Sequence, residues 1–325
     1  MTTPRRFSFA PPAPFDLATT VRTHGWVELA PWRWDGATLA RAERIGGAIG
    51  ELAIRQAAPG RVTVTWRGLR DVGITPLPNP PPQGGRGKSG RSEATALRGA
   101  VRAAVARALS WDWDAAEFLA RARRLDRRCH DLVARGGGRL LRGTSFYEDF
   151  VKTVCTVNTT WAGTVRMAER LVARVGDGAF PTPGQVLAAG AGALQAACGL
   201  GYRAAPLVRA TALLLEARAL DADGHGRADA LGYEALLALP GIGPYAAAHC
   251  RVLLHDFSRL PIDSSVTAHM ATVLARKQRT RKAGRQTSAH AALEAHFARW
   301  GEFRFLGYRL AKVAARLAAG EDYEW

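Results

Sequence analysis

One short segment, Leu239-Pro-Gly-Ile-Gly-Pro-Tyr-Ala-Ala247, constrains the fold more than any other part of the chain. Apolar stretches with helical spacing lie directly before and after it. Gly241 and Gly243 permit left-handed backbone angles and close approach of another molecule to the backbone, and Pro244 suits the first turn of a helix. The segment therefore predicts two helices joined by a tight turn.

The predicted turn is also a candidate anion site. The first N–H groups of a helix have no partner inside the helix, and the helix dipole adds positive potential at the same end. We expect Gly241, Ile242, Gly243 and Tyr245 to hold a phosphate there. The segment is not a dinucleotide-binding fingerprint, because a helix precedes it and no third glycine follows at the required spacing.

The charge of the chain fits a polyanionic partner but has a second explanation. The 325 residues include 45 Lys and Arg against 28 Asp and Glu, which gives a formal net charge of +17. Such a charge raises the local concentration of nucleic acid or anionic lipid. Only five of the cations are lysines, however, and an arginine- and alanine-rich composition also follows from GC-rich coding. With 47% hydrophobic residues, the chain is expected to fold rather than to be disordered.

Signals for cofactors and membranes are weak. The four cysteines lie 26, 43 and 52 residues apart and form no Cys-x-x-Cys pair, so we expect buried free thiols, no metal site and no cofactor. Residues 1–20 lack the apolar core of a signal peptide, and glycines interrupt the apolar stretch 186–202. We therefore expect no membrane span and a cytoplasmic location, associated with the nucleoid if the source is bacterial.

A Pro- and Gly-rich stretch over residues 76–91 divides the chain. Before it, strand-like alternation is clearest at 61–66 and weaker at 25–34 and 50–56. After it, the pattern predicts helices over 97–109, 115–134, 147–154, 160–175, 187–197, 205–219, 233–239, 245–255, 264–277, 289–300 and 307–318. We predict a mainly α protein. Residues 1–92 form a smaller α+β domain with an antiparallel sheet, ending in the 76–91 linker, and residues 93–325 form an all-α, two-lobed body.

The hairpin, together with an acid that follows it, resembles the helix-hairpin-helix (HhH-GPD) DNA glycosylase superfamily. There a Leu-Pro-Gly-(Val/Ile)-Gly core precedes a catalytic aspartate. Here Leu260-Pro-Ile-Asp263 supplies the acid, 18 residues after Tyr245. Asp263 also suits the N-cap of the predicted helix over 264–277, and the two roles are compatible.

Two upstream blocks extend this resemblance. The block from Gly143 to Trp161, which contains Asn158, resembles the helix and turn that carry an Asn or Gln into the gap left by the flipped nucleotide. The block Gly201-Tyr-Arg-Ala204 is similar to one in the alkylpurine and oxoguanine branches, where the aromatic residue wedges into the base stack. The resemblance implies that Asn158 and Tyr202 are DNA wedge residues and that Arg203 is a further DNA contact. Taken singly, Asn158 also suits a helix cap, and Tyr202 ordinary packing.

The resemblance implies a monofunctional mechanism. Bifunctional members carry a lysine, which forms a Schiff base with the sugar, at the position of Tyr245. Lys152 lies outside that position and is expected to be solvated on its helix. A fixed carboxylate at Asp263 would stabilise the oxocarbenium character of the sugar and orient the attacking water. The extruded base would stack on Tyr245 and Trp161, most strongly if it is alkylated and electron-deficient.

The motifs favour an alkylated purine such as 3-methyladenine as the substrate of a monomer acting on damaged double-stranded DNA. Gly163 and Ser265 stand where the oxoguanine branch has an arginine and a histidine. A glycosylase for 8-oxoguanine or a mismatched base and a non-catalytic, damage-sensing DNA-binding protein stay open as alternatives. The run 276–285 holds six cations, among them Arg279 and Arg281, and is either a solvated loop or an additional DNA contact.

Overall fold

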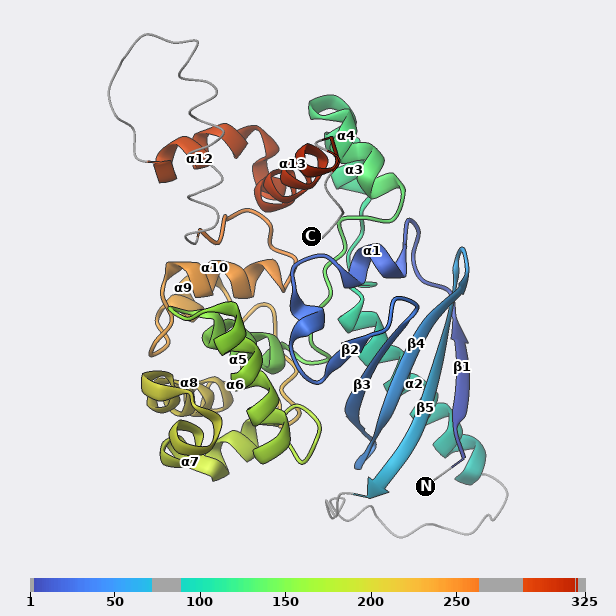
Figure 1. Cartoon of the computed structure of the whole chain (residues 1–325), viewed down its shortest axis with the longest axis vertical. Coiled ribbons are helices and arrows are strands. Elements are labelled where there is room, and N and C mark those ends of the chain that lie inside the picture. Colours follow the sequence, from blue (N-terminus) through green and yellow to red (C-terminus); the bar gives the residue numbers. More distant parts are fainter. Residues whose placement is uncertain (1–2, 72–88, 263–288, 319, 321–325) are drawn as a thin grey trace.

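The computed structural model describes residues 3–71, 89–262, 289–318 and 320, which are mainly helical with one small sheet (Figure 1). The sheet and the long helix α2 (Ser89–Ala108) lie on one side of the molecule, and most of the other helices lie beside them. The predicted combination of a mainly α chain with a smaller antiparallel sheet is confirmed.

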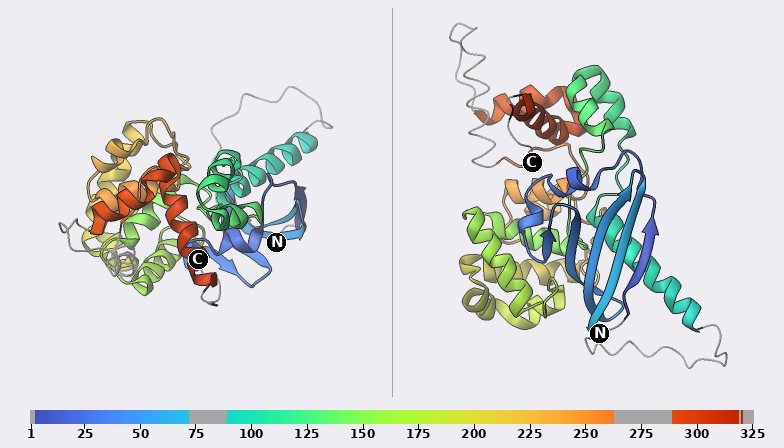
Figure 2. Two further views of the ribbon diagram at one scale, coloured as in Figure 1. Left: turned by 90° about the horizontal axis from the view of Figure 1, so that it is seen from above. Right: turned by 45° about the vertical axis from the view of Figure 1, so that its right-hand side comes forward.

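Five antiparallel strands form the sheet in the order β1-β5-β4-β3-β2. Their bounds are Arg5–Phe9 (β1), Trp32–Trp34 (β2), Thr38–Ile45 (β3), Ala48–Ala58 (β4) and Arg61–Asp71 (β5). From Val62 to Trp66 every second residue of β5 is buried, as in a strand with one face on a core. Val62 and Val64 share a hydrophobic cluster with Val101 and Val105 of α2, which explains why α2 packs along the sheet (Figure 2).

Two of the three predicted strands are confirmed, since 50–56 lies within β4 and 61–66 within β5. Only the end of the third, 25–34, is a strand. Trp26–Glu28 form the short 3-10 helix η1 instead, because Gly25, with φ of 80°, turns the chain there.

The helices predicted within the described ranges are present. Their bounds are α3 (Ala116–Leu125), α4 (Arg127–Ala134), α5 (Phe146–Thr156), α6 (Trp161–Arg174), α7 (Pro183–Cys198), α8 (Ala204–Glu216), α9 (Tyr233–Leu237), α10 (Pro244–Val252), α12 (Ala289–Phe297) and α13 (Arg304–Ala318), with the shorter α1 (Leu17–Val21), η2 (Gly201–Arg203) and η3 (Ala298–Phe303). The predicted helix 115–134 divides at Asp126, whose extended backbone ends α3 and whose side chain caps α4. The predicted helix 264–277 lies outside the described residues. None of the described helices has the length and apolar character needed to cross a membrane.

Buried apolar side chains form two clusters. One joins the sheet with α2, α3, α4, α12 and α13, and the other joins α5 to α10. Because the first cluster continues across residue 92, the sheet shares its core with the helices that follow it. The domain division at residue 92 stays a prediction.

Candidate nucleic-acid interface

The predicted turn between two helices is confirmed: α9 ends at Leu237 and α10 begins at Pro244. Gly241 has φ of 76°, and a Cβ there would lie 2.8 Å from Cβ of Pro206, so both backbone and packing require glycine. Gly243 does not adopt the left-handed angles that it permits. Its backbone is extended (φ −98°, ψ 179°), and a Cβ would meet nothing within 4 Å. Any requirement for glycine at 243 therefore comes from outside the described residues.

The N-terminal end of α10 is open to solvent and suits an anion. Gly241 and Gly243 are exposed, whereas Ile242 between them is buried. Within the described ranges, neither glycine N–H has a protein acceptor. Tyr245 lies in the first turn of α10 and is half-buried. Unpaired N–H groups at the positive end of a helix dipole are what a phosphate requires.

Gly243→Asp is expected to weaken binding to undamaged duplex DNA by about tenfold or more. A like charge beside a phosphate costs about 1 to 4 kcal/mol at a protein surface, and about 1.4 kcal/mol is a factor of ten. The fold tolerates the change, because aspartate suits an extended N-cap residue. Gly99→Asp on α2, where a Cβ also meets nothing within 4 Å, controls for the added charge. Equal affinities of the two variants in fluorescence anisotropy would argue against a phosphate at the hairpin.

The two predicted wedge residues are brought together beside the hairpin. Asn158 follows α5 with φ of 48°, and its Nδ2 lies 3.4 Å from the hydroxyl of Tyr202 in η2. Tyr202 is 63% exposed, unusual for so large a ring. Tyr202 and Gly241 also line one small pocket of about 40 Å³, so the wedge pair and the hairpin are neighbours.

Arg203, which the resemblance implies is a DNA contact, has a buried side chain in the structure. It is 8% exposed, and its guanidinium donates to the carbonyl oxygens of Val157 and Asn158 while lying 4.6 Å from the ring centre of Tyr202. An arginine with these partners supports the wedge from beneath, because its donors are directed into the protein rather than towards solvent.

The two residues predicted to stack on the base, Trp161 and Tyr245, contact different elements. Trp161, at the start of α6, donates from Nε1 to Glu28 at 2.6 Å and packs over Gly25. Tyr245 has its hydroxyl 3.5 Å from Oγ1 of Thr156 at the end of α5. Trp161 is 38% exposed, so its face is partly available to a ligand.

Three further rings, which the sequence did not predict as part of the site, follow one another beside Tyr245: His249, Trp26 and His24. Ring centres lie 5.8 Å apart for Tyr245 and His249, 5.2 Å for His249 and Trp26, and 4.7 Å for Trp26 and His24, the last pair stacked. Burial lowers the pKa of His24 well below its ordinary value, and His249 adds to the effect. No pattern marks residues 24–26, because they meet α10 only in the folded chain.

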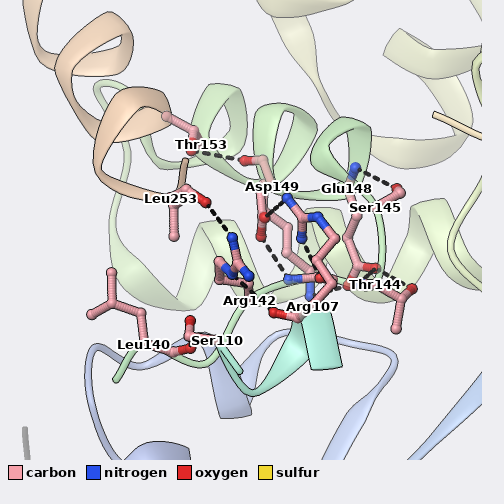
Figure 3. A network of polar contacts seen from close by, with 12 residues as sticks. Arg107, Ser110, Leu140, Arg142, Thr144, Ser145, Glu148, Asp149, Thr153 and Leu253 are labelled. Carbon is pink, nitrogen blue, oxygen red and sulfur yellow. Dashed lines mark hydrogen bonds and ion pairs between the residues drawn. The ribbon is translucent and has the colours of Figure 1, made fainter. Parts of the chain in front are cut away.

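Helix α5 carries two buried carboxylates on consecutive residues, Glu148 and Asp149 (Figure 3). Glu148 accepts from the Arg41 guanidinium at 3.1 and 2.8 Å and from Nζ of Lys152 at 2.7 Å. Burial alone would raise the pKa of Glu148, but the two cations lower it to about 2. The carboxylate is therefore a buried negative charge at neutral pH.

The prediction that Lys152 is solvated is wrong. Lys152 is 1% exposed and also donates to the carbonyl oxygen of Leu29 at 3.3 Å. Burial lowers the pKa of Lys152, and the carboxylate of Glu148 opposes the shift. Helix α5 is buried from residue 146 to 155, so it has no solvated face at this position.

Asp149 makes a separate set of contacts and is 0% exposed. Its Oδ1 accepts from Nε1 of Trp26 at 3.0 Å and from the N–H of Gly143 at 2.7 Å. Its Oδ2 accepts from Nη2 of Arg107 at 2.7 Å (Figure 3). One carboxylate thus joins η1, α2 and the chain before α5.

The predicted catalytic Asp263 and the basic residues Arg279 and Arg281 of the run 276–285 lie outside the described residues. The described chain leads to Ile262, the residue before Asp263, which packs partly buried against the first hydrophobic cluster.

A cavity of about 690 Å³ lies between the β3–β4 turn, α2 and the first turn of α5. Its lining includes Arg44, Ala104 and Ser145 but no hairpin or wedge residue, so it is not the predicted base site.

All four cysteines are buried free thiols, as predicted. Burial raises the pKa of Cys155 and of Cys250 to about 12, which makes both unreactive. In the part of the chain that the structure covers, no group of three or more His, Cys, Asp or Glu side chains could hold a metal ion.

Comparison with known proteins identifies the fold. No protein-family model and no curated protein matches the sequence. Among solved structures, the chain is similar to the 3-methyladenine DNA glycosylase from Archaeoglobus fulgidus, with a TM-score of 0.65 and 17% identity over 96% of this chain and 99% of that one. It is also similar to the apo form of the 8-oxoguanine glycosylase/lyase from Clostridium acetobutylicum, with a TM-score of 0.57 and 13% identity over 91% and 92% of the two chains. The predicted resemblance to these two glycosylase branches is confirmed at the level of the fold.

Proposed function

We propose that this chain, which has the fold of the DNA glycosylases, hydrolyses the N-glycosidic bond of a damaged base extruded from double-stranded DNA. The observation that carries the proposal is the hairpin, whose open N–H groups at Gly241 and Gly243 lie beside the wedge pair Asn158 and Tyr202. The presence of two hydrophobic clusters is compatible with the two-lobed body that we predict from the sequence.

Each part of this interface has a step to perform. The hairpin binds a backbone phosphate, and Tyr202 and Asn158 occupy the gap that the extruded nucleotide leaves. Tyr245 stacks on the extruded base. The carboxylate of Asp263 then stabilises the positive charge that develops on the sugar and orients the attacking water.

We further propose that the enzyme leaves an intact abasic site and acts as a monomer. A lyase step needs an amine that reaches the sugar. Tyr245 stands at the hairpin position that a lysine would use, and the ammonium of Lys152 is buried against Glu148.

Sodium borohydride is therefore expected to trap no covalent complex between the protein and damaged DNA. Denaturing gel electrophoresis would measure trapping. The variant Tyr245→Lys, which introduces an amine at the hairpin, serves for comparison. Efficient trapping of the wild type would show that another amine attacks the sugar.

An alkylated purine such as 3-methyladenine is the proposed substrate. An electron-poor, cationic base stacks strongly on neutral rings, and the neutral imidazole of His24 lies in the same ring series as Tyr245 and His249. The likeness to an archaeal 3-methyladenine glycosylase agrees with this choice.

A panel of duplexes tests the substrate, each carrying one lesion: an alkylated purine, 8-oxoguanine or a mismatched base. Alkaline cleavage at abasic sites measures base release. Release from the alkylated duplexes alone is the expected result, and release from another lesion would reassign the substrate. Binding to damaged duplexes without release of any base would favour a damage sensor and overturn the proposed activity.

A further inference from the structure

Trp26 and Asp149 form a buried pair beneath the ring surface of α10. Trp26 is 2% exposed, whereas His24 and His249, which both lie against it, are half-buried. The indole is therefore the floor of the three-ring group, and the two imidazoles lie nearer to solvent.

The floor is held by a buried carboxylate that accepts hydrogen bonds from three donors. Asp149 accepts from Arg107 and from the backbone of Gly143 as well as from Nε1 of Trp26. Hydrogen bonds to an ionised acceptor are stronger and more directional than neutral ones. Because the other two donors fix the carboxylate, its bond to Nε1 fixes the plane of the indole.

We propose that Asp149 is a positioning residue, which through Trp26 aligns His24 and His249 as part of the surface that receives the extruded base beside Tyr245. This inference rests on the proposed function. It assigns a role to residues 24–26 and to the carboxylate of Asp149, which takes no part in the chemical step.

The arrangement favours a flat, electron-poor base. Trp26 and His24 are stacked with an interplanar angle of 17°, and His249 is tilted by 32° from Trp26. Since the pKa of His24 is lowered by burial, its ring stays uncharged at neutral pH and does not repel a cationic base. If the indole rotated, both imidazoles would lose their support.

A second tryptophan offers a matched control. Trp300 is 1% exposed and stacks on Phe118 with ring centres 5.5 Å apart, in the region of α3 and η3. Its Nε1 is buried and has no partner among the described residues. Trp300→Leu therefore also removes one indole from the core but leaves the rings beside α10 unchanged.

The test compares Trp26→Leu, Trp26→Phe and Trp300→Leu at a temperature where circular dichroism shows all three folded. Two quantities are measured: the affinity for a duplex with a tetrahydrofuran abasic-site analogue, and the single-turnover rate of base release from the best lesion of the panel. The abasic duplex presents no base to the surface, so its affinity reports folding, backbone binding and insertion of the wedge residues, but no contact with an extruded base.

Trp26→Leu is expected to release the base about tenfold more slowly than the wild type, as lost ring contacts imply, with abasic-duplex affinity within about twofold. Trp26→Phe, which keeps a ring but cannot donate to Asp149, is expected to lie between Trp26→Leu and the wild type. Trp300→Leu is expected to keep the wild-type rate.

Equal rates for Trp26→Leu and Trp300→Leu would overturn the inference. If Trp26→Phe released the base at the wild-type rate, the hydrogen bond between Trp26 and Asp149 would have no positioning role. Failure of the wild type to release any base is a distinct result that would overturn the proposed function itself.

Discussion

Replacing Asp263 with asparagine is expected to lower the rate of base release by about 10²- to 10³-fold, the usual effect of removing one preorganised electrostatic group. The neutral amide cannot stabilise the cationic sugar or accept a proton from water. Affinity for the duplex should stay unchanged or increase slightly, because a negative charge near phosphates is lost. Single-turnover alkaline cleavage measures the first quantity and anisotropy the second.

The same substitution separates the two roles that the sequence allows for Asp263. Asparagine is as good an N-cap as aspartate, so a residue that only caps a helix would tolerate it. Asp229→Asn is the control, because it makes the same change in net charge at an exposed ion pair with Arg227. If Asp263→Asn and Asp229→Asn released the base at equal rates, Asp263 would have no catalytic role and would only cap the helix.

Glu148→Gln is expected to lower the free energy of unfolding by about 3 to 5 kcal/mol, the cost of removing one member of a buried ion group. The change leaves the ammonium of Lys152 buried without its carboxylate and removes the bidentate partner of Arg41. Urea denaturation followed by circular dichroism measures the loss.

Glu51→Gln is the matched control, since Glu51 pairs with Arg33 at 3.0 Å with both side chains more than a third exposed. Screening by solvent limits such a pair to about 1 kcal/mol or less. If the two variants lost similar amounts, the charges around α5 would be better solvated than their burial indicates.

The contribution of Glu148 also has a defined pH dependence. Its pKa is lowered from 4.5 to about 2 in the folded protein, so between these values the unfolded chain binds more protons. The stabilisation is therefore complete above about pH 5 and is lost as the pH falls towards 2. We expect the stability difference between wild type and Glu148→Gln to shrink in acid over that interval.

Features set by local sequence were predictable. Gly and Pro at fixed positions specify the turn before α10, and helical periodicity locates most of the helices. The family resemblance gave Asn158 and Tyr202 as wedge residues, but the sequence alone could not show that the two side chains lie in contact or that Arg203 supports them from inside.

Features that depend on pairing between distant residues were not predictable. Strand β3 reads as polar because Arg41 and Glu43 point inward, where a core strand normally has apolar side chains. These charges are buried because Glu148 and Thr144, about a hundred residues later, complete their contacts. For the same reason, no periodicity identified Lys152 as buried or residues 24–26 as part of the interface.

The bond between Arg41 and Glu148 also bears on how the chain folds. Its two ends are 107 residues apart, so the intervening chain must close a long loop before this bond can form. Contacts of such long range slow folding, and a fragment that began after residue 92 would keep the pair of Glu148 and Lys152 but lose the bidentate bond from Arg41. The sheet therefore supplies a buried ion-pair partner to the helix that leads to Asn158, and we expect a fragment without the sheet to be less stable than the whole chain.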